Sequence, residues 1–156
     1  MLYNFITKIA RGEQKGMLIG TYRHQIDEKC RMRMPGKFKN ELGDNFIVTK
    51  GTNNCLYAFS KDKFEELYAK LSNLPIFDAE VQKPVRMVLA SAFEIEEDKQ
   101  GRILLAKELR EYAKISKNIV FIGSGSRVEI WAEEQWNDYN SGDFTETSKA
   151  LAGLGV

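Results

Sequence analysis

Two short stretches of the chain carry the same pair of charged residues at the same spacing. Residues 26–34 read IDEKCRMRM and residues 97–105 read EDKQGRILL, so an aspartate precedes an arginine by four positions in each. The pairs, which lie at an offset of 71 residues, are Asp27 with Arg31 and Asp98 with Arg102. An aspartate favours a turn because its carboxylate accepts hydrogen bonds from backbone N–H groups just ahead of it.

An arginine at the end of such a turn suits nucleic-acid binding. Its planar guanidinium contacts phosphate or guanine through two N–H groups at once. The spacing therefore predicts two turns that each present an arginine to a nucleic acid. The alternative is a salt bridge that only braces each turn.

The first of the two stretches lies in a strongly basic segment. Five cations occur within eleven residues without an acidic residue between them: Lys29, Arg31, Arg33, Lys37 and Lys39. Three of these, Lys29, Arg31 and Arg33, share one face if the segment is extended, because side chains alternate along a strand. The segment is either a phosphate-binding patch or a solvated strand edge protected by charge.

Composition limits the remaining possibilities. The chain has 156 residues, of which 43% are hydrophobic, and a net charge of +1. This length predicts one domain, or two very small ones, with an ordinary core, and the composition excludes both pervasive disorder and a uniformly basic surface. No apolar run approaches the length of a membrane span, so no membrane partner is expected.

Other candidate chemistry is weaker. The two cysteines, Cys30 and Cys55, are expected to be free thiols in a reducing cytosol. His24 is the only histidine, so a metal site is not expected, and a nucleophile–base pair of Cys30 with His24 has no third residue to orient it. The glycines of residues 123–126 lack the Gly-Lys-Ser/Thr ending of a P-loop and are placed where a hairpin must turn. We therefore predict no enzymatic activity, no cofactor and no small-molecule substrate.

The similarity between the two stretches extends into the sequence that follows each of them. The order of apolar segments recurs, with residues 46–48 matched by 119–121 and residues 56–59 by 128–131. Each repeat is expected to contain four short strands and two helices. The expected strands are 18–25, 31–34, 46–50, 55–59, 92–96, 102–105 and a hairpin over 118–131, and the expected helices are 35–42, 60–72, 78–92, 107–113 and 132–140. Ser60 is expected to cap its helix, and Pro84 to interrupt or to begin the helix over 78–92.

Two halves of this size have open sheet edges and little core alone. If they exchange strands they can close a barrel, and the two Asp–Arg turns then face the same side. The expected organisation is an N-terminal extension (1–16), a first repeat (17–72), a helical linker (73–91), a second repeat (92–141) and a flexible tail (142–156).

The repeat with Asp-x-x-x-Arg in each half resembles the MraZ family of bacterial transcriptional regulators. The resemblance covers residues 17–140, and Met17 matches the usual start of the family. It is carried by residues 17–20, Tyr22, Ile26, Asp27, Arg31, Pro35, Phe38, 42–44, Cys55, Leu56, Asp98, 101–103, Trp131 and Trp136. The resemblance implies an α+β, mainly β fold: a pseudo-two-fold swapped-hairpin barrel of two tandem AbrB-type halves with flanking helices.

The resemblance also implies a function. Family members bind short direct repeats in promoter DNA of the division and cell-wall gene cluster, upstream of their own gene, as ring-shaped homo-oligomers. A cytoplasmic, nucleoid-associated regulator is therefore expected, and the alternatives are a non-specific nucleoid protein or a ring-forming interaction scaffold. The family motif assigns DNA binding to Asp27, Arg31, Asp98 and Arg102, and local charge adds Lys29, Arg33 and Lys99.

One residue departs from the family pattern. The first turn usually has glycine before its arginine, as the second turn has in Gly101, whereas this chain has Cys30. A cysteine resists positive φ, so the conformation of the first turn is open to question. Because the first repeat is the more basic one, we predict that it dominates the phosphate contacts.

Overall fold

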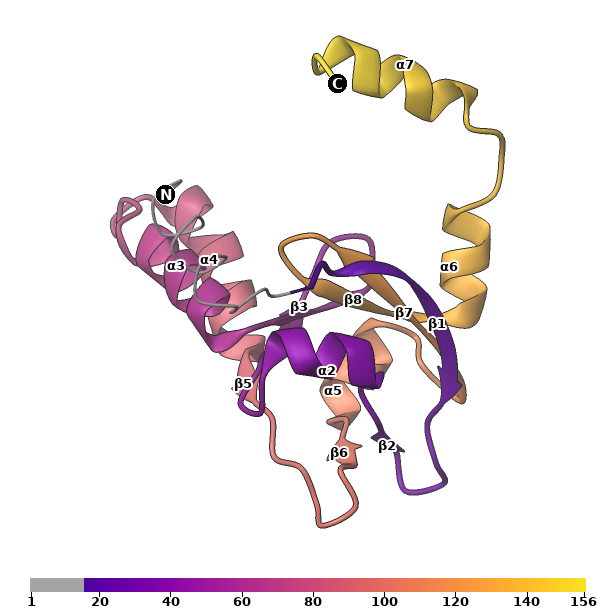
Figure 1. Ribbon diagram of the computed structural model, residues 1–156. Coiled ribbons are helices and arrows are strands. Elements are labelled where there is room, and N and C mark those ends of the chain that lie inside the picture. Colours follow the sequence, from indigo (N-terminus) through magenta and orange to yellow (C-terminus); the bar gives the residue numbers. More distant parts are fainter. Residues whose placement is uncertain (1–15) are drawn as a thin grey trace, which may run out of the picture.

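The computed structural model describes residues 16–156 as an α+β fold whose two halves repeat one order of elements (Figure 1). The first half contains β1 (Ile19–Gln25), β2 (Arg31–Met32), α2 (Gly36–Leu42), β3 (Ile47–Lys50), β4 (Leu56–Phe59) and α3 (Lys61–Ser72). The second half contains β5 (Phe93–Glu94), β6 (Ile103–Leu104), α5 (Lys107–Tyr112), β7 (Asn118–Ser124), β8 (Val128–Ala132) and α6 (Glu133–Tyr139). Helix α4 (Ala79–Ser91) links the halves, and α7 (Thr145–Gly153) follows them. The extension expected over residues 1–16 lies outside the described residues except for Gly16.

Polar side chains cap the N-termini of α3 and α4. Ser60 caps α3 as predicted, its Oγ accepting from the backbone N–H of Lys63 at 3.2 Å. Asp78 caps α4 in the same way, so the helix begins well before Pro84 and runs through that proline. Pro35 is the N-cap of α2, so this helix begins at Gly36, one residue later than expected.

The two halves exchange strands. β1 of the first half pairs with β7 of the second, β5 of the second pairs with β3 of the first, and β2 pairs with β6. All these pairings are antiparallel, and they give a six-stranded sheet in the order β1-β7-β8-β4-β3-β5 and a separate two-stranded sheet of β2 and β6. β1 and β5 are the edges of the larger sheet, so the paired strands do not close into a barrel.

One core lies between the exchanged strands and the short helices. Phe38 of α2, Phe46 and Leu56 of the first half and Ile103 and Phe121 of the second are all fully buried in it. Because both halves supply this core, a half on its own would expose apolar side chains that are buried in the whole molecule. The shared core therefore fixes the position of one half relative to the other.

The aromatic residues near α6 have a packing role. Trp131 is buried and packs edge-on against Trp136, with ring centroids 5.3 Å apart. Its indole N–H donates to Glu129 at 3.1 Å. These contacts show that Trp131 packs within the molecule.

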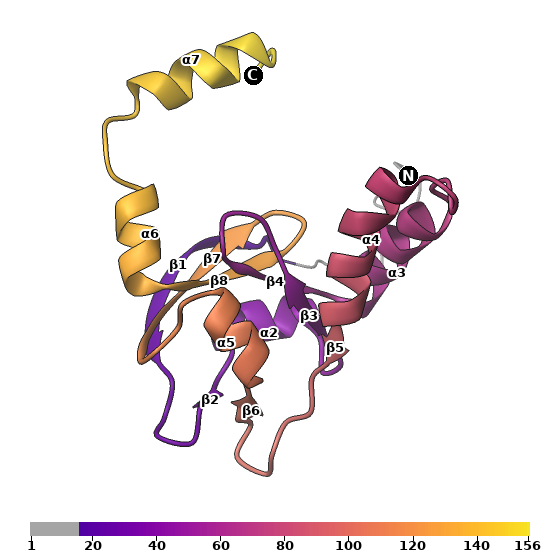
Figure 2. The same ribbon diagram turned by 180° about the vertical axis from the view of Figure 1, so that it is seen from behind.

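The segment after α6 contains a helix that the sequence did not predict. In both views α7 stands away from the sheets, joined to α6 by a short linker (Figures 1 and 2). Phe144, Leu151 and Leu154 are exposed there. The flexibility expected for residues 142–156 stays a prediction. Within the described part of the chain, no helix has the length and apolar character needed to cross a membrane.

Candidate nucleic-acid interface

The first Asp–Arg turn is held by one carboxylate. Oδ1 of Asp27 accepts the backbone N–H groups of Lys29 at 2.9 Å and Arg31 at 3.0 Å. Oδ2 accepts Nε of Arg31 at 2.7 Å. The backbone closes the loop, because the N–H of Asp27 donates to the carbonyl of Arg31 at 2.9 Å. The aspartate thus sets the turn and orients the arginine together.

The second turn repeats these contacts. Oδ1 of Asp98 accepts the backbone N–H groups of Gln100 and Arg102, each at 2.9 Å, and Oδ2 accepts Nε of Arg102 at 2.7 Å. The backbone N–H of Arg102, followed by its side chain, lowers the pKa of Asp98 to about 2. The matching bonds from Arg31 also lower the pKa of Asp27. Both aspartates therefore remain ionised at neutral pH.

The residue before each arginine adopts a left-handed conformation. Gly101 has φ +75°, which glycine adopts without steric cost. Cys30 has φ +62°, in the region that L side chains rarely adopt. The first turn therefore forms with a cysteine at this position. Its carboxylate and backbone bonds hold Cys30 in the conformation that Gly101 adopts in the second turn. The cost of the left-handed conformation is about 1–2 kcal/mol.

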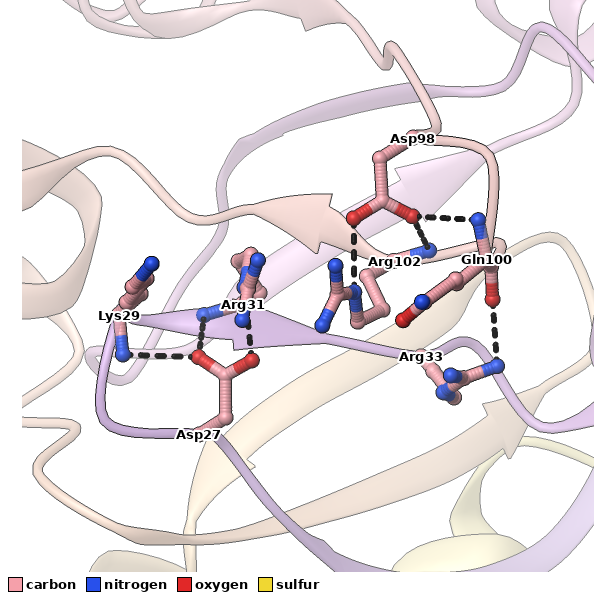
Figure 3. A network of polar contacts seen from close by, with 7 residues as sticks. All are labelled: Asp27, Lys29, Arg31, Arg33, Asp98, Gln100 and Arg102. Carbon is pink, nitrogen blue, oxygen red and sulfur yellow. Dashed lines mark hydrogen bonds and ion pairs between the residues drawn. The ribbon is translucent and has the colours of Figure 1, made fainter.

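Pairing of β2 with β6 brings the two turns together. Arg31 lies opposite Leu104 and Met32 opposite Ile103, and the loops before both strands project from the same end of the molecule (Figures 1 and 2). In Figure 3 the guanidinium groups of Arg31 and Arg102 occupy the space between the two aspartates. Nη1 of Arg33 donates to the carbonyl of Gln100 and joins one turn to the other (Figure 3).

The arginines line one hollow. Its volume is about 440 Å³, and its walls comprise residues 23–27, Arg31, Arg33 and Arg102. Arg31 and Arg102 each use Nε in their aspartate bond, and their Nη groups have no hydrogen-bond partner within residues 16–156. Each side chain is 25% exposed. Two guanidinium groups that line the hollow thus keep Nη groups without a partner among the described residues.

The remaining predicted residues take different positions. Lys29 and Lys99 are exposed on the loops but do not line the hollow. Two further members of the basic segment lie on α2, where Lys39 forms an ion pair with Glu97 and Lys37 is exposed. Sequence reasoning missed Arg23 of β1, which lines the hollow. The only feature of the sequence that could have indicated Arg23 is its outward position on a strand with alternating side chains.

The other residues considered as candidate chemical groups have the following positions. Among residues 16–156 no group of three His, Cys, Asp or Glu side chains is placed to hold a metal ion. His24 packs its ring edge-on against Phe121, with centroids 5.4 Å apart. Residues 118–132 form the predicted hairpin, but its turn comprises residues 125–127, with Gly125 at φ +73°, and Gly123 and Ser124 are the last residues of β7.

Fold and site together define a class: a two-repeat α+β protein that exchanges strands between its halves and presents two arginine turns on one surface. The family model described as "MraZ protein" matches this chain twice, over residues 17–86 and 88–152. The chain therefore belongs to the MraZ family.

Curated relatives agree with this assignment. "Transcriptional regulator MraZ" of Thermoanaerobacter pseudethanolicus is 45% identical over 143 residues, which cover 90% of this chain and all of the relative. The protein of that name from Acetivibrio thermocellus is 45% identical over 87% of this chain and 94% of the relative. The one from Clostridium tetani is 42% identical over 90% of this chain and all of the relative.

Proposed function

We propose that the protein is a sequence-specific DNA-binding transcriptional regulator of the division and cell-wall gene cluster. It binds short direct repeats upstream of its own gene, in the cytoplasm and in association with the nucleoid. The names of its relatives, which describe transcriptional regulators, support the regulatory role. In this role the protein needs no catalytic group and no cofactor.

The observation that carries the proposal is the pair of Asp–Arg turns at one end of the molecule. Each aspartate accepts the backbone N–H and the Nε–H of its arginine and leaves the Nη groups available. Such a fork contacts phosphate oxygens or the O6 and N7 atoms of guanine. Because the carboxylates also fix the backbone, the arginines are oriented before DNA binds, and less conformational entropy is lost on binding.

The exchanged strands and the two sheets support the swapped-hairpin arrangement of AbrB-type halves that we propose for the fold. Its consequence for function is that both turns approach one DNA segment together. Assembly of several copies into a closed ring then multiplies the contacts, and binding to spaced repeats gains strongly from multivalency. Exposed Leu74, Ile76 and Phe77, between α3 and α4, supply apolar surface of the kind that contacts between copies use.

Fluorescence anisotropy tests the proposal. The full chain is titrated against duplex DNA from upstream of its own gene and against a scrambled duplex, across a series of salt concentrations. We expect tighter binding to the native repeats, with log K falling linearly with log salt concentration. Equal binding to both duplexes would indicate a non-specific nucleoid protein, and no binding at low salt would favour an interaction scaffold.

A further inference from the structure

The hollow between β1 and the two turns contains an arginine that no Asp-x-x-x-Arg pattern marks. Arg23 lines it together with Arg31, Arg33 and Arg102, whereas Asp27 is the only acidic residue in the wall. Four cations face one acidic residue in a space of about 440 Å³. Asp27, Asp98 and Glu133 each pair with one of these arginines, and Arg33 has no acidic partner within residues 16–156, so a net positive charge remains at the hollow.

Arg23 is held at the rim by α6. Its Nη1 donates to Oε1 of Glu133 at 3.0 Å, and its Nη2 donates to the side-chain oxygen of Asn137 at 3.3 Å. The two charged side chains of this ion pair are 50% and 32% exposed. Water and salt weaken ion pairs at such exposure, so another anionic acceptor, such as a phosphodiester, can replace Glu133.

We propose that this hollow binds one backbone phosphate of DNA, and that Arg23 exchanges Glu133 for the phosphate when DNA binds. The proposal rests on the proposed function, since it assigns a contact within the same interface. Phosphate oxygens accept from several arginine forks at once, and charge-assisted bonds of this kind are the strong ones. Arg23 then adds a contact from β1 to those from the two turns, while Glu133 acts as an internal competitor.

The test is a double-mutant cycle, measured by anisotropy with the own-upstream duplex and a scrambled duplex. Arg23→Gln is expected to reduce the slope of log K against log salt by about 0.9, and to weaken binding to both duplexes alike. Glu133→Gln is expected to tighten binding by up to about fivefold, the equivalent of an exposed ion pair. In the Arg23→Gln background, Glu133→Gln is expected to have no effect.

Two control variants make the same charge changes elsewhere. Arg86 of α4 and Glu66 of α3 are exposed, and neither lines the hollow. Arg86→Gln and Glu66→Gln are expected to leave the salt slope and the affinity close to those of the wild type. Circular dichroism establishes that every variant is folded.

The outcomes separate this proposal from the proposed function. If Arg31→Ala weakens binding to the native repeats while Arg23→Gln keeps the wild-type slope, the phosphate site is wrong and the regulator stands. The site is also wrong if Arg86→Gln lowers the slope as much as Arg23→Gln does, or if Glu133→Gln tightens binding equally without Arg23. If the wild type does not prefer the native repeats, the proposed function itself is wrong.

Discussion

The turn before β2 and the turn before β6 have the same geometry but differ in sequence at the residue before the arginine. Their carboxylate bonds have matching partners and agree within 0.1 Å. The residue before the arginine is Cys30 in the first turn and Gly101 in the second, and both have positive φ. The comparison shows that the aspartate and the closing backbone bonds determine the turn, and that glycine only lowers its cost.

The two turns differ more in their surroundings. The first half contributes Arg23, Arg31 and Arg33 to the hollow, whereas the second contributes Arg102 alone. Leu104, the residue equivalent to Arg33, is apolar and exposed. The two turns therefore have the same geometry but different numbers of neighbouring arginines. The effect of this difference on DNA binding can be tested.

The largest effect is expected from removing each arginine in turn. Arg31→Ala is expected to weaken binding to the native repeats about 10-fold or more, and Arg102→Ala to weaken it less, because only Arg31 has two neighbouring arginines from its own half. Anisotropy with the own-upstream duplex measures both losses, and Arg86→Ala serves as the control. An equal loss of affinity in the two variants, or a larger loss in Arg102→Ala, would contradict this prediction.

A smaller effect is expected from exchanging the residues before the arginines. Gly101→Cys is expected to lower the free energy of unfolding by about 1 kcal/mol, since the added Cβ has open space around it but a strained φ. Cys30→Gly is expected to raise that free energy by less than about 1 kcal/mol, because relief of strain is partly offset by a freer unfolded chain. Urea denaturation at one fixed protein concentration measures both. A Gly101→Cys variant as stable as the wild type would show that the left-handed conformation is not costly here.

The stabilisation of the second turn by the Asp98 carboxylate is expected to be lost only at low pH. Because the pKa of Asp98 in the folded protein is about 2, below its ordinary value of 3.8, the stabilisation by this carboxylate is complete above about pH 4. It is lost as the pH falls through about 2. A carbon-13 NMR titration of the Asp98 carboxyl measures the midpoint, and Arg102→Ala is expected to raise it. A wild-type midpoint at 3.8 or above would contradict the bonding described for this turn.

The smallest effect is expected from Cys30→Ser, which should leave DNA affinity unchanged because the turn depends on Asp27 and the backbone. The thiols themselves differ, since burial raises the pKa of Cys55 to about 12. Iodoacetamide is therefore expected to modify the half-buried Cys30 before Cys55, as read by mass spectrometry. Loss of DNA binding in Cys30→Ser would instead indicate a role for the thiol.

Local patterns predicted most of the fold. The alternation of β1, the cap at Ser60 and the repeated Asp–Arg turns depend on residues close in the sequence, and the structure contains all three. The strand exchange followed from the open edges that each half alone would have. Its pairing and register come from the structure, because they are long-range contacts.

Long-range contacts also explain what the sequence analysis missed at the site. The ion pair of Lys39 with Glu97 spans the two halves, so local charge counting could not show it. Arg23 is the only Lys or Arg in β1, so local charge counting did not indicate that it lines the hollow with the other arginines. Helix α7 was missed because its small and polar residues are typical of irregular chain.

The most direct test of the central claim is the affinity of an Arg31→Ala/Arg102→Ala double variant for DNA from upstream of its own gene. Both side chains are partly exposed and outside the core, so the variant is expected to fold as the wild type does. If the paired turns form the DNA surface, the double variant loses its preference for the native repeats over a scrambled duplex, and the slope of log K against log salt becomes smaller. Wild-type affinity and preference in a folded double variant would contradict the account.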